Sequence, residues 1–406
     1  MSFVTHLECG NCGREHEADR LQGLCTACRR PLLVRYDLEA VGKHFTKRDL
    51  AGRPPTIWRY LELLPVTEPA KIVSLTETIT PILGAPRLAQ RLGLKHLLVK
   101  DESRLPTGSF KARGMALALS MANEFGVTKV AAPSAGNAGG ALAAYAARAG
   151  MEAWVFMPED TPVVNVVEAV LAGARTYRVN GLIDDCGRLV AEGEQEMGWW
   201  NVSTLKEPYR LEGKKTMGLE LAEQFEWDLP DVILYPTGGG TGLIGMWKAF
   251  QELEALGWLR SRRRPRLYAC QSDGCAPIVT AFQSNGRFAK RADGARTIAS
   301  GVRVPSAVGD FLILDAVRES GGAAVSTSED DVARWMREAT ASEGISFCPE
   351  TAVCLGALEQ LVDRGEIRPK ERVLLFNTGA GQKYVEAAGV DVPRLDLGRP
   401  VVWSDL

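Results

Sequence analysis

From about residue 70 onward, short apolar segments alternate with alanine-rich segments, and this alternation limits the possible folds more than any other feature. The candidate strands carry β-branched or apolar side chains at nearly every position, as strands buried on both faces do. The clearest helical segments between them are 140–149 and 243–254. Such alternation predicts an α/β fold with parallel sheets. The predicted strands are 97–100, 129–132, 153–157, 175–179, 231–235, 267–270 and 373–376.

Length and charge set broader limits. The chain has 406 residues, 46% of them hydrophobic and 24% charged, which is enough for two or three domains with large cores. Its net charge of −2 gives no reason to expect nucleic acid as a partner. One local group of arginines is interpreted as a solvated loop rather than a phosphate site: Arg260, Arg262, Arg263, Arg264 and Arg266.

Targeting and membrane signals are absent from the sequence. No basic segment followed by an apolar run stands at the beginning, and no stretch approaches the length of a membrane-spanning helix. Five cysteines are scattered in apolar contexts typical of reduced core residues: Cys186, Cys270, Cys275, Cys348 and Cys354. We therefore expect a cytoplasmic protein without a membrane partner.

The remaining four cysteines form two Cys-x-x-Cys pairs separated by twelve residues, at Cys9, Cys12, Cys25 and Cys28. Each pair can offer two thiolates from a tight turn, and two such turns complete a tetrahedral zinc site. Four thiolates close the coordination sphere, so the metal is expected to stabilise structure rather than to catalyse. The alternatives are a site that has lost its metal and a pair of disulfides.

Lys111 stands where the strand 97–100 has passed through a polar turn and the next helix begins. The positive end of a helix dipole disfavours a charged lysine, so we expect a lowered pKa for Lys111. A neutral amine can form a Schiff base with an aldehyde cofactor such as pyridoxal phosphate (PLP). The alternative for this residue alone is a solvated lysine on a helix surface.

Three further turns follow predicted strands, where open parallel sheets bind ligands. The turn 133–140 offers Ser134 and Asn137 as hydrogen-bonding groups and a helix N-terminus suited to a carboxylate. The run Thr237-Gly-Gly-Gly-Thr-Gly242 lets several backbone N–H groups meet a phosphate. The turn 376–383 carries one hydroxyl, which can meet a heterocycle nitrogen. Each of these could also be a plain turn.

A dinucleotide has to be considered as well, because residues 240–245 satisfy G-x-G-x-x-G and Asp273 could serve a ribose. The positions of the histidines argue against a dinucleotide-dependent dehydrogenase. None of the four histidines lies in these turns: His6, His16, His44 and His96. A Ser-His-Asp hydrolase and a histidine-based dehydrogenase are therefore disfavoured. A lysine with two glycine-rich turns favours PLP over NAD.

Taken together, these segments resemble the β-family (fold-type II) PLP enzymes, and most closely the threonine synthases. The resemblance covers most of the chain. It rests on the cysteine pairs ahead of 31–37, the segment 74–81, Pro106-Thr-Gly-Ser-Phe-Lys111, the Ser-x-Gly-Asn turn, 209–216, the glycine run, and the final Thr-Gly-x-Gly-x-Lys.

This resemblance implies a tryptophan synthase β-like fold with two parallel-sheet α/β domains and an N-terminal zinc-ribbon-like segment. The boundaries would be 1–36 for the ribbon, 37–110 and 206–406 for the large PLP domain, and 111–205 for the small substrate domain. Independently of the resemblance, the proline-containing run Arg53-Pro54-Pro55 predicts a linker. A homodimer is usual in similar enzymes.

The resemblance also implies roles for individual residues. Lys111 would be the Schiff-base lysine and Asn137 a partner of the cofactor's ring hydroxyl. Thr378 would meet the pyridine nitrogen. Ser134 and Arg210 would face the substrate, Arg210 as a cation for its phosphate. The cofactor phosphate would be held by Gly238, Gly239, Gly240, Thr241 and Gly242.

The sequence departs from the threonine synthase pattern around the substrate. An Asp, two Thr, an Asn-Ser pair and a His of that pattern are replaced by Ala112, Ala135, Ala138, Thr204-Leu205 and Ala380. The leading hypothesis is a lyase that converts O-phospho-L-homoserine and water to L-threonine and phosphate. The runner-up is another PLP reaction on this scaffold, either ammonia loss from serine or threonine or β-replacement on O-phosphoserine, as in cysteate synthases. A non-catalytic zinc-ribbon interaction protein and an NAD oxidoreductase are weaker alternatives.

Overall fold

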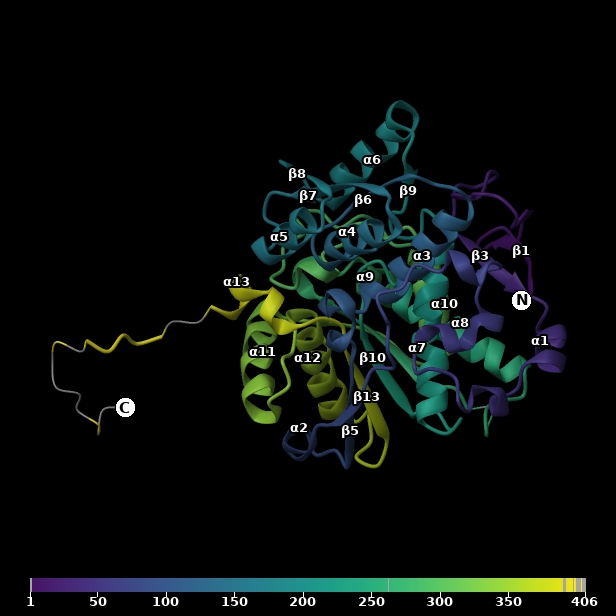
Figure 1. Cartoon of the computed structure of the whole chain (residues 1–406). Helices are drawn as coiled ribbons and strands as arrows, with labels where there is room; N and C mark the ends of the chain where they lie inside the picture. The colour runs from purple at the N-terminus through teal and green to yellow at the C-terminus, as the bar shows by residue number, and fades with distance from the viewer. Residues whose placement is uncertain (1, 262, 390–391, 397, 399–402, 404–406) are drawn as a thin grey trace.

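A computed structural model describes residues 2–261, 263–389, 392–396, 398 and 403 (Figure 1). Arg262 of the predicted arginine loop lies outside the described residues. Three sheets are present: a small antiparallel sheet near the N-terminus, a six-stranded sheet and a four-stranded sheet. In Figure 1 the four-stranded sheet lies above the six-stranded one, and the N-terminal strands lie to one side of both.

The N-terminal sheet has the strand order β2-β1-β3 and is antiparallel. Leu7 and Val34 are buried in the same core as Met115 and Leu119 of α3, so this segment is packed onto the rest of the molecule. Its elements are β1 (Val4–Cys9), β2 (Glu15–His16), β3 (Leu32–Tyr36) and the short helix α1 (Leu38–His44) that follows.

The segment after α1 contains residues 53–55, which were predicted to be a linker, and it is held by ion pairs. Arg53 forms a two-pronged ion pair with Glu62, at 2.7 Å for both contacts, and Arg59 reaches Glu223 of α7 at 2.7 Å. The prolines there interrupt regular structure, but the flanking arginines fix the segment to the large domain. It consists of the 3₁₀ turns η1 (Lys47–Leu50), η2 (Ile57–Leu63) and η3 (Pro69–Lys71).

The six-stranded sheet has the order β12-β11-β10-β13-β5-β4, parallel except for β4. Alternate side chains of its central strands enter two cores, one with α7, α8 and α10, the other with α2, α11 and α12. Its strands are β4 (Ile82–Gly84), β5 (His96–Asp101), β10 (Val232–Pro236), β11 (Arg266–Ser272), β12 (Ala324–Thr327) and β13 (Arg372–Asn377). Its helices are α2 (Pro86–Arg91), α7 (Tyr209–Gln224), α8 (Thr241–Ala255), α9 (Pro277–Gln283), α10 (Asp310–Glu319), α11 (Glu329–Glu343), α12 (Pro349–Asp363) and α13 (Val385–Ala388).

The four-stranded sheet is parallel, with the order β8-β7-β6-β9. Helices α3 and α4 are buried against one face, and Trp154 and Trp199 pack with Val190 of α6 on the other. Its strands are β6 (Lys129–Pro133), β7 (Glu152–Pro158), β8 (Arg175–Val179) and β9 (Trp200–Asn201); its helices are α3 (Lys111–Glu124), α4 (Asn137–Ala149), α5 (Val163–Leu171) and α6 (Ile183–Met197).

All seven predicted strands are present, within a residue or two of the predicted bounds. In the two larger sheets, the sequence reading missed β4, β9 and β12, which have two to four residues each and too little apolar pattern to stand out. Strands β1 and β2 of the N-terminal sheet were not predicted either. Both predicted helices begin a few residues earlier than expected, because the preceding turns lead directly into the first helical turn. Among the described residues, no helix is long and apolar enough to cross a membrane. The domain boundaries stay a prediction.

Candidate active site

Lys111 is the first residue of α3, after β5 and two short 3₁₀ turns. Its ammonium nitrogen lies 4.5 Å from the centre of the Phe110 ring. The surrounding protein lowers the pKa of Lys111 to about 8, mainly by desolvation and further by the charge of Arg210, while Glu350 opposes the shift. The predicted direction of the pKa change therefore agrees with the structure, but burial rather than the helix dipole is its main cause.

The turn between β6 and α4 is organised by Ser134. Its hydroxyl donates to the carbonyl of Gly136 at 2.6 Å and accepts hydrogen bonds from the backbone N–H groups of Gly136 and Gly139. Ser134 was predicted to face the substrate; its hydroxyl is already used in shaping the turn. Asn137 follows as the first residue of α4. Its amide donates to the Tyr384 hydroxyl at 2.9 Å, while its buried Oδ1 has no partner among the described residues.

The glycine-rich turn connects β10 to α8, which begins at Thr241. Gly240 has φ of +72°, and a Cβ atom there would come within 2.2 Å of the Ile313 side chain. A Cβ atom on Gly242 would lie 2.0 Å from the Tyr235 hydroxyl oxygen. Glycine is therefore required here both by backbone conformation and by space. Backbone N–H groups at the start of a long helix suit a bound phosphate.

Thr378 lies in the turn after β13, and this turn is tied to the lysine turn by backbone contacts. The Phe110 N–H donates to the Thr378 carbonyl at 3.0 Å, and the Ala380 N–H donates to the Gly108 carbonyl at 2.9 Å. The Thr378 hydroxyl lies 3.7 Å from the Cys348 sulfur. Because β13 and β5 are adjacent parallel strands, the two turns that follow them meet at the same edge of the sheet.

These turns surround one cavity of about 460 Å³. Almost all of the predicted site residues line it: Lys111, Ser134, Asn137, Gly238, Gly239, Gly240, Thr241, Gly242 and Thr378. Arg210 does not. It is 2% exposed and donates to the Val202 carbonyl at 2.7 Å. Asp273, considered for a ribose, also lies outside the cavity wall, so the wall offers no support for a dinucleotide.

Sequence reasoning missed Glu350, which is the second residue of α12 and lines the cavity. One carboxylate oxygen accepts the Gly301 N–H at 2.8 Å, whereas Oε2 has no partner among the described residues. Burial raises the pKa of Glu350 above its usual range. No turn or glycine pattern in the sequence marks this position, because its closeness to Lys111 arises only when α12 packs against the sheet.

The cavity fits PLP on chemical grounds. Its wall combines an amine of lowered pKa, glycines at a helix N-terminus and several buried polar atoms that have no hydrogen-bond partner within the described part of the chain. Buried polar groups normally find hydrogen-bond partners, so these atoms point to a polar ligand. They are Asn137 Oδ1, Tyr235 Oη, Ser300 Oγ and Glu350 Oε2.

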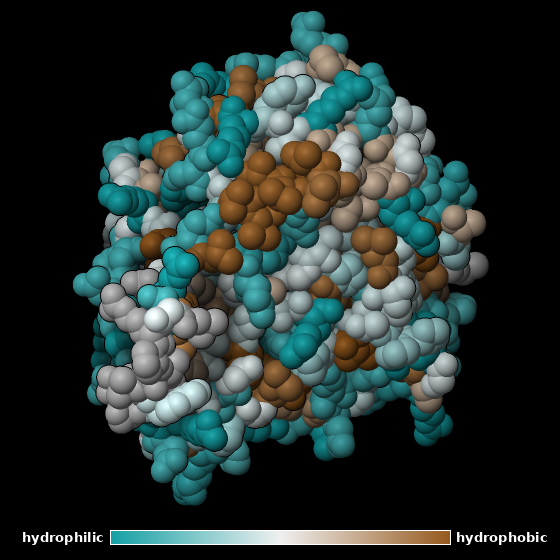
Figure 2. Space-filling model, turned by 60° about the vertical axis from the view of Figure 1, so that its left-hand side comes forward, coloured by the Kyte–Doolittle hydropathy of each residue, from teal (hydrophilic) through white to brown (hydrophobic). Residues whose placement is uncertain are grey.

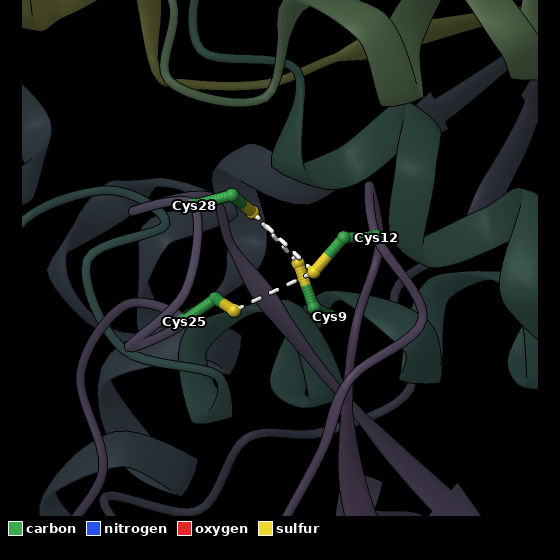
Figure 3. Close-up of side chains that lie close together, drawn as sticks. All are labelled: Cys9, Cys12, Cys25 and Cys28. Atoms are coloured by element: carbon green, nitrogen blue, oxygen red, sulfur yellow. Dashed lines mark hydrogen bonds between the residues drawn. The ribbon is translucent and has the colours of Figure 1, made fainter.

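The four N-terminal cysteines converge as the sequence predicted (Figure 3). Their sulfur atoms all lie within 4.8 Å of one another, and the contacts Cys9–Cys28 and Cys12–Cys25 measure 3.4 and 3.7 Å. Zinc–sulfur bonds of about 2.3 Å in a tetrahedron place sulfur atoms about 3.8 Å apart. The cluster is therefore compatible with a zinc site.

The two parallel sheets and the lysine-bearing cavity at their edges define an α/β enzyme of the kind that carries PLP on a lysine. The sequence pattern of the family described as "Pyridoxal-phosphate dependent enzyme" matches residues 73–379, and the chain belongs to this family, with threonine synthases as its relatives. The threonine synthase of Methanocaldococcus jannaschii is 34% identical over 94% of this chain and 93% of its own. That of Methanosarcina acetivorans is 35% identical over 92% and 91%.

Solved structures are similar in fold. Maize serine racemase matches with a TM-score of 0.64 and 20% identity, over 80% of this chain and 91% of its own. The processed form of threonine deaminase isoform 2 from Solanum lycopersicum matches with a TM-score of 0.64 and 20% identity, over 83% and 96%. The protein thus has the fold-type II architecture expected from its sequence.

Proposed function

We propose that this PLP-dependent lyase converts O-phospho-L-homoserine and water to L-threonine and phosphate. The cavity supports PLP chemistry on an amino acid. The observation that carries the choice of substrate is the similarity, over more than nine-tenths of the chain, to two proteins named threonine synthase.

We assign the cofactor's holding groups as the resemblance implied. Lys111 would be the covalent attachment point, Asn137 would meet the ring hydroxyl, and Thr378 would meet the ring nitrogen. Backbone N–H groups of the glycine turn, from Gly238 to Gly242, would bind the phosphate. When bound, PLP supplies an electron-withdrawing ring that stabilises negative charge on the substrate's α carbon.

Lys111 then carries the proton transfers. With a pKa of about 8, its amine is near the balance point between base and acid at neutral pH, which suits a group that both takes and returns protons. Lys111 would take the protons from the α and β carbons as phosphate leaves from the γ carbon, and would return protons to the γ carbon and then to the α carbon. The hydroxyl of the added water ends on the β carbon, which completes threonine. The N-terminus of α4, shaped by Ser134, orients the substrate carboxylate.

Product analysis tests the proposal. The PLP-loaded protein is supplied with O-phospho-L-homoserine, and phosphate and threonine are measured together. Release of both in equal amounts is the expected result. A keto acid with ammonia from serine or threonine, or a β-substituted amino acid from O-phosphoserine, would assign the runner-up reaction instead, with Ala135 and Ala138 as the changes in the cavity wall.

We further propose a structural zinc ion on Cys9, Cys12, Cys25 and Cys28. Metal removal by a strong chelator is expected to lower the melting temperature, because the ribbon would lose its main internal support. A Cys12→Ser variant, altering an exposed ligand, should retain less zinc by elemental analysis. Full zinc content in this variant would contradict the assignment. A homodimer and a cytoplasmic location stay predictions.

A further inference from the structure

The loop between β9 and α7, residues 202–208, brings a second lysine to the cavity wall. Lys206 is half-buried and lines the cavity together with Ser203 and Thr204. Thr204 lies over the glycine turn, since a Cβ atom on Gly239 would come within 2.8 Å of Thr204 Cγ2. The loop is therefore adjacent to the proposed cofactor site.

This loop is fixed at both ends. Asn201 Oδ1 accepts hydrogen bonds from the backbone N–H of Ser203 at 3.0 Å and from its hydroxyl. At the other end, the Glu207 carboxylate accepts the N–H groups of Tyr209 at 2.6 Å and Arg210 at 3.0 Å. Because both ends are held by buried hydrogen bonds, the backbone of Lys206 is positioned before any ligand binds.

Leu205, immediately before the lysine, has φ of +59°, a conformation that is unfavourable for leucine. Such strain persists only where the surroundings impose it. Leu205 is 2% exposed and packs on Gly309, where a Cβ atom would lie 2.3 Å from Leu205 Cδ1. The left-handed turn thus allows Leu205 to enter the core while the next side chain lines the cavity.

Lys206 also places a positive charge on the cavity wall that is not paired with a described side chain and can therefore bind a ligand. Its ammonium has no hydrogen bond or ion pair with any part of the chain that the structure describes. By contrast, Arg303 is bound by Asp160 through two contacts of 2.5 and 2.6 Å, and Arg188 pairs with Asp185 at 3.2 Å. Lys111 is assigned to the cofactor. An unpaired cation beside a cavity favours an anionic ligand.

Arg210 is a weaker candidate for the same role. Its guanidinium donates to a backbone carbonyl, it does not line the cavity, and its backbone N–H is bound by Glu207. An anion would have to displace these contacts to reach it, whereas the Lys206 ammonium needs only to lose water.

We propose that Lys206 binds the phosphate group of the substrate and so selects amino acids with a phosphorylated side chain. This inference rests on the proposed function, in which the substrate is O-phospho-L-homoserine. The substrate's two anionic groups are then received by different loops, the carboxylate by the N-terminus of α4 and the phosphate by the 202–208 loop.

The test compares Lys206→Met and Lys206→Arg with the parent, all loaded with PLP. The absorbance of the bound cofactor is titrated with O-phospho-L-homoserine and with L-homoserine, and inorganic phosphate is added as a competitor. Loss of a charge-assisted hydrogen bond should raise the Kd for O-phospho-L-homoserine and for phosphate about tenfold or more in Lys206→Met. Binding of L-homoserine and cofactor content should not change, and Lys206→Arg should restore most of the affinity.

Arg188→Gln serves as the matched control, because it removes another positive charge from the same wall. An equal loss in this variant would overturn the proposal, since the effect would then come from the general field. Unchanged phosphate affinity in Lys206→Met would also overturn it, as would loss of PLP, which would assign Lys206 to the cofactor.

The experiments distinguish a failure of the Lys206 phosphate subsite from a failure of the proposed threonine synthase reaction. Binding of O-phospho-L-homoserine that depends on Lys206, without release of threonine and phosphate, would keep the subsite and reject the reaction. Threonine formation with an unchanged KM in Lys206→Met would keep the reaction and reject the subsite. If neither O-phospho-L-homoserine nor phosphate binds to the parent protein, the subsite is rejected.

Discussion

Helices α7 and α8 on the six-stranded sheet are enclosed by the protein, whereas helices α5 and α6 of the four-stranded sheet lie at its surface. In α7 every residue from Tyr209 to Ala222 is buried, and α8 is buried along most of its length. In α5 only Asn165 and Ala169 are buried, and in α6 only Cys186 and Val190. Figure 2 shows apolar side chains gathered on the face that carries α5; its exposed members are Val163, Val167, Val170 and Leu171.

Because of this difference, the two sides of the cavity are held with different rigidity. The glycine turn and the Thr378 turn leave the deeply packed sheet, so the groups proposed for the cofactor are held by a rigid framework. The turn from Ser134 to Asn137 leaves the thinner sheet, whose outer helices have few buried contacts. Regions with few buried contacts open at lower free-energy cost. We therefore expect the substrate side to adapt more readily than the cofactor side.

The largest effect is expected at Lys111, which joins the two regions because β5 precedes it and α3 packs on the other sheet. Lys111→Ala removes both the covalent attachment and the proton-transfer group. Activity should fall about 10³-fold or more, with the fold unchanged by circular dichroism. Borohydride reduction followed by mass spectrometry should attach PLP to the parent protein but not to the variant. Attachment at another lysine would contradict the assignment.

A large effect is also expected when the rigid side is disturbed at Gly240. Gly240→Ala would force alanine into a left-handed conformation, at about 1–2 kcal/mol, and press its Cβ atom against Ile313. Overpacking typically adds about 1–3 kcal/mol. Cofactor affinity, measured by fluorescence titration of the cofactor-free protein, should fall by tenfold or more.

Gly126→Ala is the matched control, since Gly126 has φ of +71° and open space where a Cβ atom would lie. It should lose stability by the conformational cost alone and keep its cofactor affinity. Equal cofactor losses in the two variants would show that the glycine turn is not the phosphate site.

A smaller effect is expected from pH. Only the neutral amine of Lys111 reacts with an aldehyde, and with a pKa of about 8 its neutral fraction falls about tenfold for each pH unit below 8. The rate of PLP uptake by the cofactor-free protein should rise accordingly up to pH 8 and then level off. The unfolded chain binds this proton up to about pH 10.5, so between pH 8 and 10.5 the burial of Lys111 should make stability increase with pH.

Two variants check the cause of this profile. Arg210 lowers the pKa of Lys111 and Glu350 raises it. Arg210→Met should therefore move the uptake profile to higher pH, and Glu350→Gln should move it to lower pH. Shifts in the same direction would mean that these charges do not set the pKa of Lys111.

The local features of the cavity could be predicted from the sequence because each leaves a local signature. A strand, a glycine-rich turn and a helix follow one another within about fifteen residues around Gly240, and parallel strands bring their carboxyl ends to one edge. The cysteine spacing likewise predicted a cluster that the structure brings together. These predictions needed no knowledge of how distant helices pack.

Other features depend on contacts between distant segments and could not be predicted. Glu350 and Lys111 line the same cavity, although more than two hundred residues separate them in the sequence. Arg210 follows the family pattern, yet the fold directs its guanidinium to the Val202 carbonyl. Lys206 reaches the cavity because Leu205 adopts a left-handed backbone conformation. That conformation is rare for leucine, so it could not be predicted from the sequence.

The smallest effect is expected at the surface of α5, on the four-stranded sheet. Two leucine substitutions, one exposed and one buried, compare the loss in the free energy of unfolding. Leu171, at the end of α5, is 81% exposed, whereas Leu243 in α8 is fully buried. Leu171→Ala should change the free energy of unfolding by less than about 0.5 kcal/mol. Leu243→Ala should cost about 2–5 kcal/mol, because it leaves a cavity in the core. Chemical denaturation of both variants gives these values directly. A loss above about 2 kcal/mol for Leu171→Ala would contradict the comparison, since the end of α5 would then have to be covered by another surface in solution.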